Sequence, residues 1–169
     1  MNFEAKRASD DLAGEVAHIL VHTWQVAYKG IMPEDYLSNI SVPKRTERIR
    51  ASILEGREEI YLFYLDGQPA GTAILNKYRD EQATDTDGEI TAFYFLPEYW
   101  GRGCAKQAMD FCQAHLRQRG YTNIRLWVLE ENARARRFYE KCGFRFDGGR
   151  NEIQIGKPLT DLCYQKAIG

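Results

Sequence analysis

The chain has 169 residues, with 23 Lys and Arg against 24 Asp and Glu, and a formal net charge of −1 at pH 7. This balance gives no sign of a nucleic-acid or membrane partner, and no apolar run approaches the ~18 residues of a membrane-spanning helix. The length predicts one domain, residues 1–169, that is large enough for a substantial core. The first residues, MNFEAKRASDD, do not form a signal peptide. The pattern of the four cysteines leads us to expect reduced thiols in a cytoplasmic protein.

The first segments are predicted to be an edge strand and a helix. Residues 2–8 suit a short strand, and Asp10 or Asp11 is expected to cap a helix that ends at Gly30. The helical stripe is Leu12, Val16, Ile19, Leu20, Thr23 and Ala27. His18 and His22 have a spacing that suits a metal, but no acidic or cysteine partner accompanies them, so we expect no metal site.

Two further helical segments precede a hairpin. A short turn is expected from Met32 to Leu37, and a helix begins at Ser41 with Pro43 in its first turn. In that helix Ile49, Ile53 and Leu54 are expected to face inward. Residues 59–65 and 70–75 predict two strands that Asp66-Gly67 joins. An acidic loop, residues 80–88, follows.

The segment 89–120 predicts a strand, a glycine turn and a helix. Residues 90–95 are apolar and aromatic, and Leu96-Pro97 ends the strand. Gly101 and Gly103 precede a helix that starts near Ala105 and that Gly120 closes. Small residues before a helix N-terminus leave free N–H groups at its positive end, which suits a phosphate. An ordinary strand-to-helix turn is the other interpretation.

The last third continues the alternation. Residues 123–129 predict a strand, Asn132 caps a helix, and Gly143 ends it. A strand at 144–146 is expected to break at Asp147-Gly148-Gly149, and a final strand covers 161–167. The order indicates a mixed α/β domain. The cysteines at 104, 112, 142 and 163 include no C-x-x-C pair, and Cys104 and Cys112 lie too far apart on one helix to bridge, so we expect reduced thiols.

Known phosphate motifs narrow the choice of ligand. No G-x-x-x-x-G-K-[ST] is present, and Lys106 stands where the dinucleotide motif needs its third glycine. The window from Trp100 to Ala105 instead resembles [QR]-x-x-G-x-[GA], the acyl-CoA loop of the GNAT superfamily of N-acyltransferases. Trp100 departs from Gln or Arg, so the pattern does not carry a side-chain contact to CoA over to this position, whereas the backbone cradle needs only N–H groups. The later NARARRFYEKCGF, residues 132–144, resembles the family pattern N-x-x-A-x-x-F-Y-x-x-x-G-F.

The resemblance implies a GNAT-like fold and an acetyl-CoA-dependent N-acetyltransferase that acts on a primary amine without a covalent enzyme intermediate. It implies that the main chain of Phe93, Tyr94 and Phe95 pairs with the pantetheine. It implies that Asn132 hydrogen-bonds the same arm, although a plain helix cap is the other interpretation. The residues that the resemblance places on the pyrophosphate are Gly101, Arg102, Gly103, Cys104, Ala105 and Lys106.

The resemblance also implies an acid and a base. Tyr139 matches the tyrosine that protonates the departing thiolate, as a phenol of pKa about 10 is able to do; a core tyrosine is the alternative. Glu89 occupies a position where some members carry their base. Counting by twos places Glu89, Thr91, Phe93 and Phe95 on one face of the strand. A water relay and a merely solvated carboxylate remain alternatives.

The acceptor side and the partners are less defined. By the resemblance, Trp24 and Tyr28 lie near the acceptor and could form an aromatic wall, or could belong to the core. The acidic run before the central strand could attract a cationic amine, or be an ordinary solvated loop. The competing functional class is a sensor that binds acyl-CoA without turnover. Exposed strand edges tend to pair, and many proteins of the GNAT superfamily pair through their C-terminal strands, so we expect a homodimer.

Overall fold

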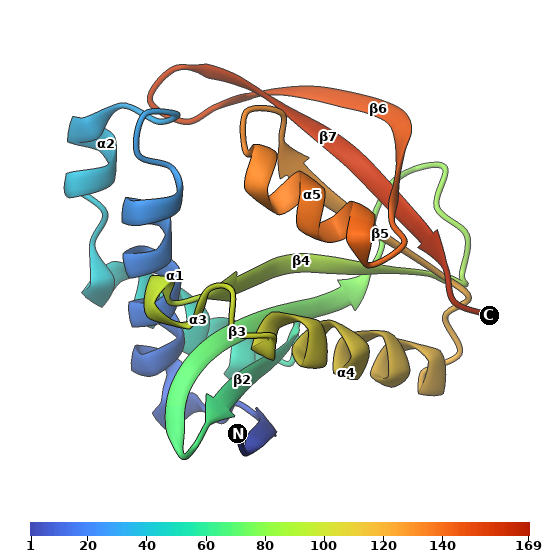
Figure 1. The fold of residues 1–169 in the computed structure, drawn as a ribbon, viewed down its shortest axis with the longest axis horizontal. Coiled ribbons are helices and arrows are strands. Elements are labelled where there is room, and N and C mark those ends of the chain that lie inside the picture. The colour runs from blue at the N-terminus through green and yellow to red at the C-terminus, as the bar shows by residue number, and fades with distance from the viewer.

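The computed structural model describes residues 1–169 and contains one mixed sheet of seven strands with helices on both faces (Figure 1). The strand order is β1-β2-β3-β4-β5-β7-β6, and β4 and β5 form the one parallel pair. The strands are β1 (Phe3–Arg7), β2 (Glu59–Leu65), β3 (Gln68–Lys77), β4 (Asp87–Phe95), β5 (Asn123–Leu129), β6 (Arg145–Gln154) and β7 (Pro158–Ala167). The helices are α1 (Ala13–Ala27), α2 (Glu34–Ser38), α3 (Val42–Glu55), α4 (Cys104–Gln118) and α5 (Ala133–Lys141). The predicted mixed α/β class is confirmed.

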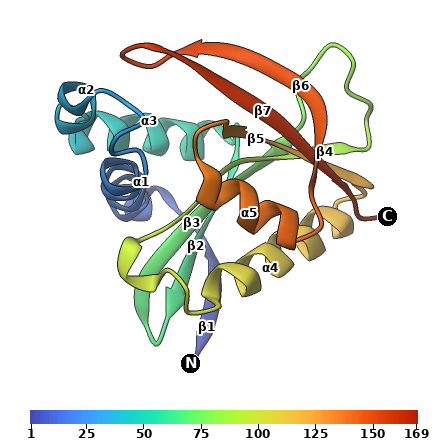
Figure 2. The same cartoon turned by 45° about the horizontal axis from the view of Figure 1, so that its top comes forward.

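The core is divided by the sheet into two main layers (Figure 2). On one face, 22 buried residues join the sheet to α4 and α5. On the other, 11 buried residues join it to α1 and α3. A smaller cluster of Tyr28, Met32, Leu37, Leu129 and Leu159 continues that second face toward α2 and β7. The face of α4 and α5 and the face of α1, α2 and α3 therefore form two separate walls around the centre of the sheet.

Most predicted boundaries agree with the structure. Asp66 and Gly67 turn between β2 and β3 with φ of 51° and 79°, as a two-residue type I′ hairpin requires. Ser41 caps α3 by accepting a hydrogen bond from the Lys44 N–H over 3.2 Å. Gly120 and Gly143 follow α4 and α5 with φ of 91° and 93°. No helix combines the length and the apolarity needed to cross a membrane.

Three predictions about local structure are wrong. Neither Asp10 nor Asp11 caps α1, because both lie in a 3-10 turn, Asp10–Leu12, and Leu12 holds the cap position. That helix ends at Ala27, before Gly30. Leu54 is 67% exposed, because it is the next residue after Ile53 and so points about 100° away from it around the helix.

The expected break at Asp147-Gly148-Gly149 is also wrong. β6 runs continuously from Arg145 to Gln154, and its register against β7 shifts between Phe146 and Arg150. Gly148 has φ of 93°, and the Asp147 carboxylate accepts a hydrogen bond from the Gly149 N–H over 2.7 Å. The glycine pair therefore makes a bulge within the strand rather than an end to it.

Candidate active site

The site lies where β4 and β5 separate. The two strands pair at three positions only, from Asp87 with Asn123 to Glu89 with Arg125. Beyond Glu89, β4 keeps its partner β3 but loses β5. A cavity of about 670 Å³ opens there, and residues from both faces of the sheet line it. A gap between parallel strands exposes main-chain groups of β4 to a ligand.

A β-bulge changes which way the β4 side chains point. Ile74 pairs with Ala92 and Leu75 with Ile90, so Thr91 is an extra residue in β4. Glu89 therefore shares its face with Ala92 and Tyr94, not with Phe93 and Phe95. The predicted common face of Glu89, Thr91, Phe93 and Phe95 is wrong, because simple alternation does not include the inserted residue.

The glycine loop leads from this strand into α4. Gly101 and Gly103 have φ of 74° and 84°, and Gly103 is the cap residue of α4. The backbone N–H groups from Gly101 to Lys106 donate no hydrogen bond to a backbone carbonyl. They lie at the positive end of a 15-residue helix, so the loop is suited to bind an anion.

Not every residue predicted for the loop faces the cavity. Gly101, Gly103, Ala105 and Lys106 line it, but Arg102 and Cys104 do not. The Arg102 guanidinium lies 5.4 Å from the centre of the Tyr99 ring. Cys104 is fully buried, where burial raises the pKa of its thiol. Both residues contribute to this loop through their main chain.

Trp100, which departs from the family pattern, has a structural role. Its indole N–H donates to the Phe95 carbonyl over 2.8 Å and ties the loop to the end of β4. Arg134, from the first turn of α5, stacks over the Trp100 ring at 3.5 Å. Because both side chains line the cavity, this stack connects the glycine loop to α5 beside the cleft. Sequence reasoning missed Arg134, since only the fold brings it to Trp100.

Asn132 and Tyr139 bring the second motif to the same cavity. The Asn132 side chain accepts a hydrogen bond from the Ala135 N–H over 3.2 Å, so it caps α5, and it also lines the cavity. Tyr139 is 8% exposed and lines the cavity from the α5 side. Burial raises the pKa of its hydroxyl, and nearby Tyr94 raises it further. At neutral pH this phenol is a proton donor.

Glu89 lies outside the cavity lining, although it is half-buried at the end of the paired part of β4. Burial raises the pKa of Glu89, the Arg79 charge opposes that shift, and the Glu58 charge adds to it. A raised pKa makes this carboxylate a stronger base. A proton from a ligand in the cavity would need an intermediate carrier to reach it.

The C-terminal end of α1 and the strand β4 supply an aromatic wall. The Trp24 ring meets the Tyr28 ring edge-on at 5.1 Å and the Tyr94 ring at 6.4 Å. The hydroxyls of Tyr28 and Tyr94 lie 3.1 Å apart. Both predicted acceptor residues, Trp24 and Tyr28, line the cavity, and the Trp24 indole N–H has no hydrogen-bond partner.

Sequence reasoning also missed the contribution of the last two strands. Ile153 and Ile155 from the β6 end and Asp161 from β7 line the same cavity. Nothing in their local sequence marks them, because β7 inserts between β5 and β6 and so brings them to the cleft. One Asp161 carboxylate oxygen, Oδ1, is buried without a hydrogen-bond partner.

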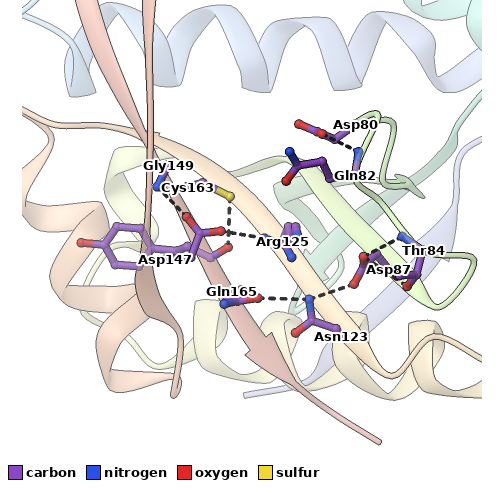
Figure 3. Close-up of polar contacts among 11 residues, drawn as sticks. Asp80, Gln82, Thr84, Asp87, Asn123, Arg125, Asp147, Gly149, Cys163 and Gln165 are labelled. Carbon is purple, nitrogen blue, oxygen red and sulfur yellow. Dashed lines mark hydrogen bonds and ion pairs between the residues drawn. The ribbon is translucent and has the colours of Figure 1, made fainter.

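The acidic loop is occupied by structural contacts (Figure 3). Asp85 forms an ion pair with Lys77 at 2.8 Å. Asp87 is 6% exposed and accepts hydrogen bonds from the Thr84 N–H and the Asn123 amide, both over 3.0 Å. Asp87 is therefore not free to attract an amine, whereas Asp85 stays exposed to solvent in its ion pair. The chain contains no group of three or more His, Cys, Asp or Glu residues placed to hold a metal, and His18 and His22 stack at 5.7 Å.

Comparison with known families agrees with this geometry. Residues 19–144 match the model of the acetyltransferase (GNAT) family. An uncharacterized N-acetyltransferase of Mycobacterium tuberculosis is 30% identical over 139 residues, which cover 82% of this chain and 86% of that protein.

Two proteins of Thermoplasma acidophilum are more distant. A spermidine N(1)-acetyltransferase is 21% identical over 148 residues, covering 87% of this chain and 91% of that protein. The crystal structure of the PaiA N-acetyltransferase in complex with coenzyme A has a TM-score of 0.75 at 20% identity and covers 99% of both chains. This last likeness establishes the fold.

Proposed function

Because this chain belongs to the GNAT acetyltransferase family, we propose that it transfers an acetyl group from acetyl-CoA to a primary amine by direct attack. The observation that carries the proposal is the cavity between β4 and β5. Both the glycine loop, with its unpaired N–H groups, and the buried Tyr139 border this cavity. The N–H groups suit the anionic part of an acyl-CoA thioester, and the tyrosine is an uncharged proton donor for its leaving group.

The chain offers three kinds of contact to the cofactor. We assign the pyrophosphate to the free N–H groups from Gly101 to Lys106, with the Lys106 charge beside them. We assign the pantetheine arm to Asn132 and to the β4 main chain at Phe93 and Tyr94. The Phe95 carbonyl is already occupied by the Trp100 indole and, over 3.3 Å, by the Thr23 hydroxyl. The Phe95 carbonyl is therefore less available than expected.

The reaction moves protons at the nitrogen, at the sulfur and at Tyr139. The acceptor ammonium loses one proton, and the neutral nitrogen forms a bond to the thioester carbonyl carbon and loses a second proton as the carbon–sulfur bond breaks. Tyr139 gives its proton to the sulfur and regains one from solvent. A primary amine of pKa about 10.4 is only about 0.04% neutral at pH 7, which costs about 4.6 kcal/mol. We propose Glu89 as the acceptor of the amine proton, through water, since it does not line the cavity. A water chain that ends elsewhere is the alternative base.

The acceptor is a small-molecule amine, a polyamine or a peptide amine, and one relative is named a spermidine N(1)-acetyltransferase. The alternative function is a sensor that binds acyl-CoA without turnover. The test combines a thermal melt with and without CoA and a panel of amines, in which thiol release from acetyl-CoA is measured. Protection by CoA with acetylation of at least one amine supports the enzyme, whereas protection without any transfer supports the sensor.

A glycine variant tests the loop assignment separately. Gly103→Val should severely weaken acetyl-CoA binding in calorimetry, because its side chain enters the anion site. Since valine is strained at the Gly103 φ of 84°, Gly120→Val is the matched control: its φ is 91°, its added side chain also meets open space, and it lies outside the cavity. Equal acetyl-CoA affinity in both variants would contradict the assignment.

Two further properties stay predictions. We propose a homodimer, because β6 is an edge strand of the sheet; a monomer mass in light scattering at tens of micromolar would exclude it. We propose a cytoplasmic location, in keeping with four free cysteines. Fractionation of cells that express the tagged chain tests this location.

A further inference from the structure

Asp161 is the one acidic residue that lines the cavity. Its Oδ1 is buried and has no hydrogen-bond partner, and none of the eight ion pairs of the chain involves it. Asp161 as a whole is only partly buried. A carboxylate oxygen that is removed from water without a donor still costs free energy, and burial raises the pKa of Asp161 although its own backbone N–H partly opposes the shift. A ligand that brings a positively charged hydrogen-bond donor would form the strongest hydrogen bond with such a carboxylate.

The register of β7 places Asp161 on the acceptor face. Asp161 pairs with Leu129 of β5, and Leu159 lies two residues before it on the same face of β7. Leu129 and Leu159 belong to the cluster that includes Tyr28 and Met32. Tyr139 belongs to the cluster on the face of α4 and α5. The carboxylate and the proposed proton donor therefore enter the cavity from opposite faces of the sheet.

The charges of the cavity follow the same division. Its basic residues, Lys106 and Arg134, belong to the α4 and α5 side, where Lys106 pairs with Asp110 and Arg134 stacks on Trp100. That side suits the anionic cofactor. On the Asp161 side of the sheet, the lining includes apolar and aromatic residues of one cluster: Trp24, Met32, Leu129, Ile153 and Ile155. These side chains suit methylene groups, and aromatic rings also accommodate a cation.

We propose that Asp161 binds a second cationic nitrogen of the acceptor, separated from the attacked amine by an apolar chain. The proposal rests on the transferase function above and narrows its acceptors to diamines, polyamines and comparable aminoalkyl cations. The attacked nitrogen itself must be neutral when it reacts, and it must reach the side of Tyr139. The carboxylate on the other face is therefore assigned to the nitrogen that keeps its charge.

The test compares two acceptors that differ at one end only: 1,4-diaminobutane, and n-pentylamine, in which a methyl group replaces the second ammonium. The wild type should show a higher kcat/KM for the diamine by about 10- to 100-fold, as a hydrogen bond to a charged group provides. Asp161→Asn should reduce this ratio to nearly one, mainly through the KM of the diamine. Glu152→Gln is the matched control, because it removes the same charge from an exposed position of the same hairpin and should keep the ratio.

Other outcomes overturn the proposal. It fails if the wild type does not distinguish the two amines, or if Asp161→Asn lowers both rates equally, which would assign the carboxylate to the attacked nitrogen. If no amine is acetylated, the transferase function fails, and calorimetry of 1,4-diaminobutane on the CoA complex still tests the subsite. The proposal is supported if the diamine binds to the wild type and to Glu152→Gln but not to Asp161→Asn. It is overturned if the diamine does not bind to the wild type.

Discussion

The two ends of the β4–β5 pair treat their carboxylates in opposite ways, although the buried Arg125 Nε at the paired end also has no hydrogen-bond partner. At the paired end, Asp87 accepts hydrogen bonds from Thr84 and Asn123, and Arg125 forms an ion pair with Asp147 at 2.6 Å (Figure 3). At the separated end, Asp161 Oδ1 and the Trp24 indole N–H have no partner. The first set holds strands together, and the second borders an open cavity.

The acidities of the two carboxylates show the difference. Burial alone would raise the pKa of Asp87, but its hydrogen bonds from Thr84 and Asn123 and the Arg125 charge lower it overall. At Asp161 burial dominates, and the pKa is raised. A buried acid that the chain itself satisfies contributes to stability, whereas a partly buried acid with one unpartnered oxygen, such as Asp161, is a candidate for ligand binding.

The largest expected effect on stability is at the paired end. Arg125→Leu leaves Asp147, whose side chain is 11% exposed, without its cation. We expect a loss of about 3 kcal/mol, which lowers the melting temperature by about 6–12 °C for a chain of this size. Arg150→Leu breaks an exposed ion pair with Glu130 and should cost less than about 1 kcal/mol. Equal shifts in both variants would remove the distinction between the paired end and the surface.

The second prediction concerns catalysis at the separated end. Tyr139→Phe keeps the ring and its packing but removes the proton donor, so kcat should fall by about 10²-fold with little change in acetyl-CoA affinity. The melting temperature should stay nearly constant, in contrast to Arg125→Leu. Tyr36→Phe, at a position 37% exposed, controls for loss of a phenol elsewhere. Full kcat in Tyr139→Phe, with chemistry rate-limiting, would make Tyr139 a core residue.

Sequence patterns predicted the parts of this site that depend on short segments. The glycine loop is marked by residues of the turn before α4, and the Asn132 cap and Tyr139 are marked by residues of α5 and its cap. The extra residue at Thr91 was not predictable, because an alternating pattern does not reveal an insertion that only pairing with β3 defines.

Long-range topology determined the rest. Asp161 was assigned to a strand but given no role, since its place beside Leu129 requires β7 to insert between β5 and β6. The stack of Arg134 on Trp100 joins two motifs that the sequence treated separately. These contacts connect segments that are distant along the chain, and no local periodicity encodes them.

The third prediction concerns the boundary between the two ends, where Glu89 lies. Glu89→Gln should lower kcat/KM at pH 7 by about 10-fold, and the loss should fade toward pH 9–10, where the amine deprotonates unaided. Since the pKa of Glu89 is raised, wild-type activity should fall as pH decreases through that raised value. The Tyr139→Phe loss should not fade toward high pH in this way. Full activity of Glu89→Gln at pH 7 would assign the base to a water chain or another residue.

The smallest expected effect compares the two carboxylates directly. Because the folded pKa of Asp161 is raised, its stability contribution is present below the unfolded pKa of about 3.9 and is lost as pH rises through the folded value. Asp161→Asn should therefore stabilise the chain slightly at pH 7, because solvent screens a partly exposed carboxylate, and the gain should vanish toward pH 4. Asp87 has a lowered pKa, so its contribution is present above the unfolded value and is lost as pH falls through the folded one. Asp87→Asn should thus destabilise at pH 7, and this difference should shrink in acid. Melting curves of both variants from pH 4 to 8 check the signs, and a destabilised Asp161→Asn at pH 7 would mean that the carboxylate is satisfied within the protein after all.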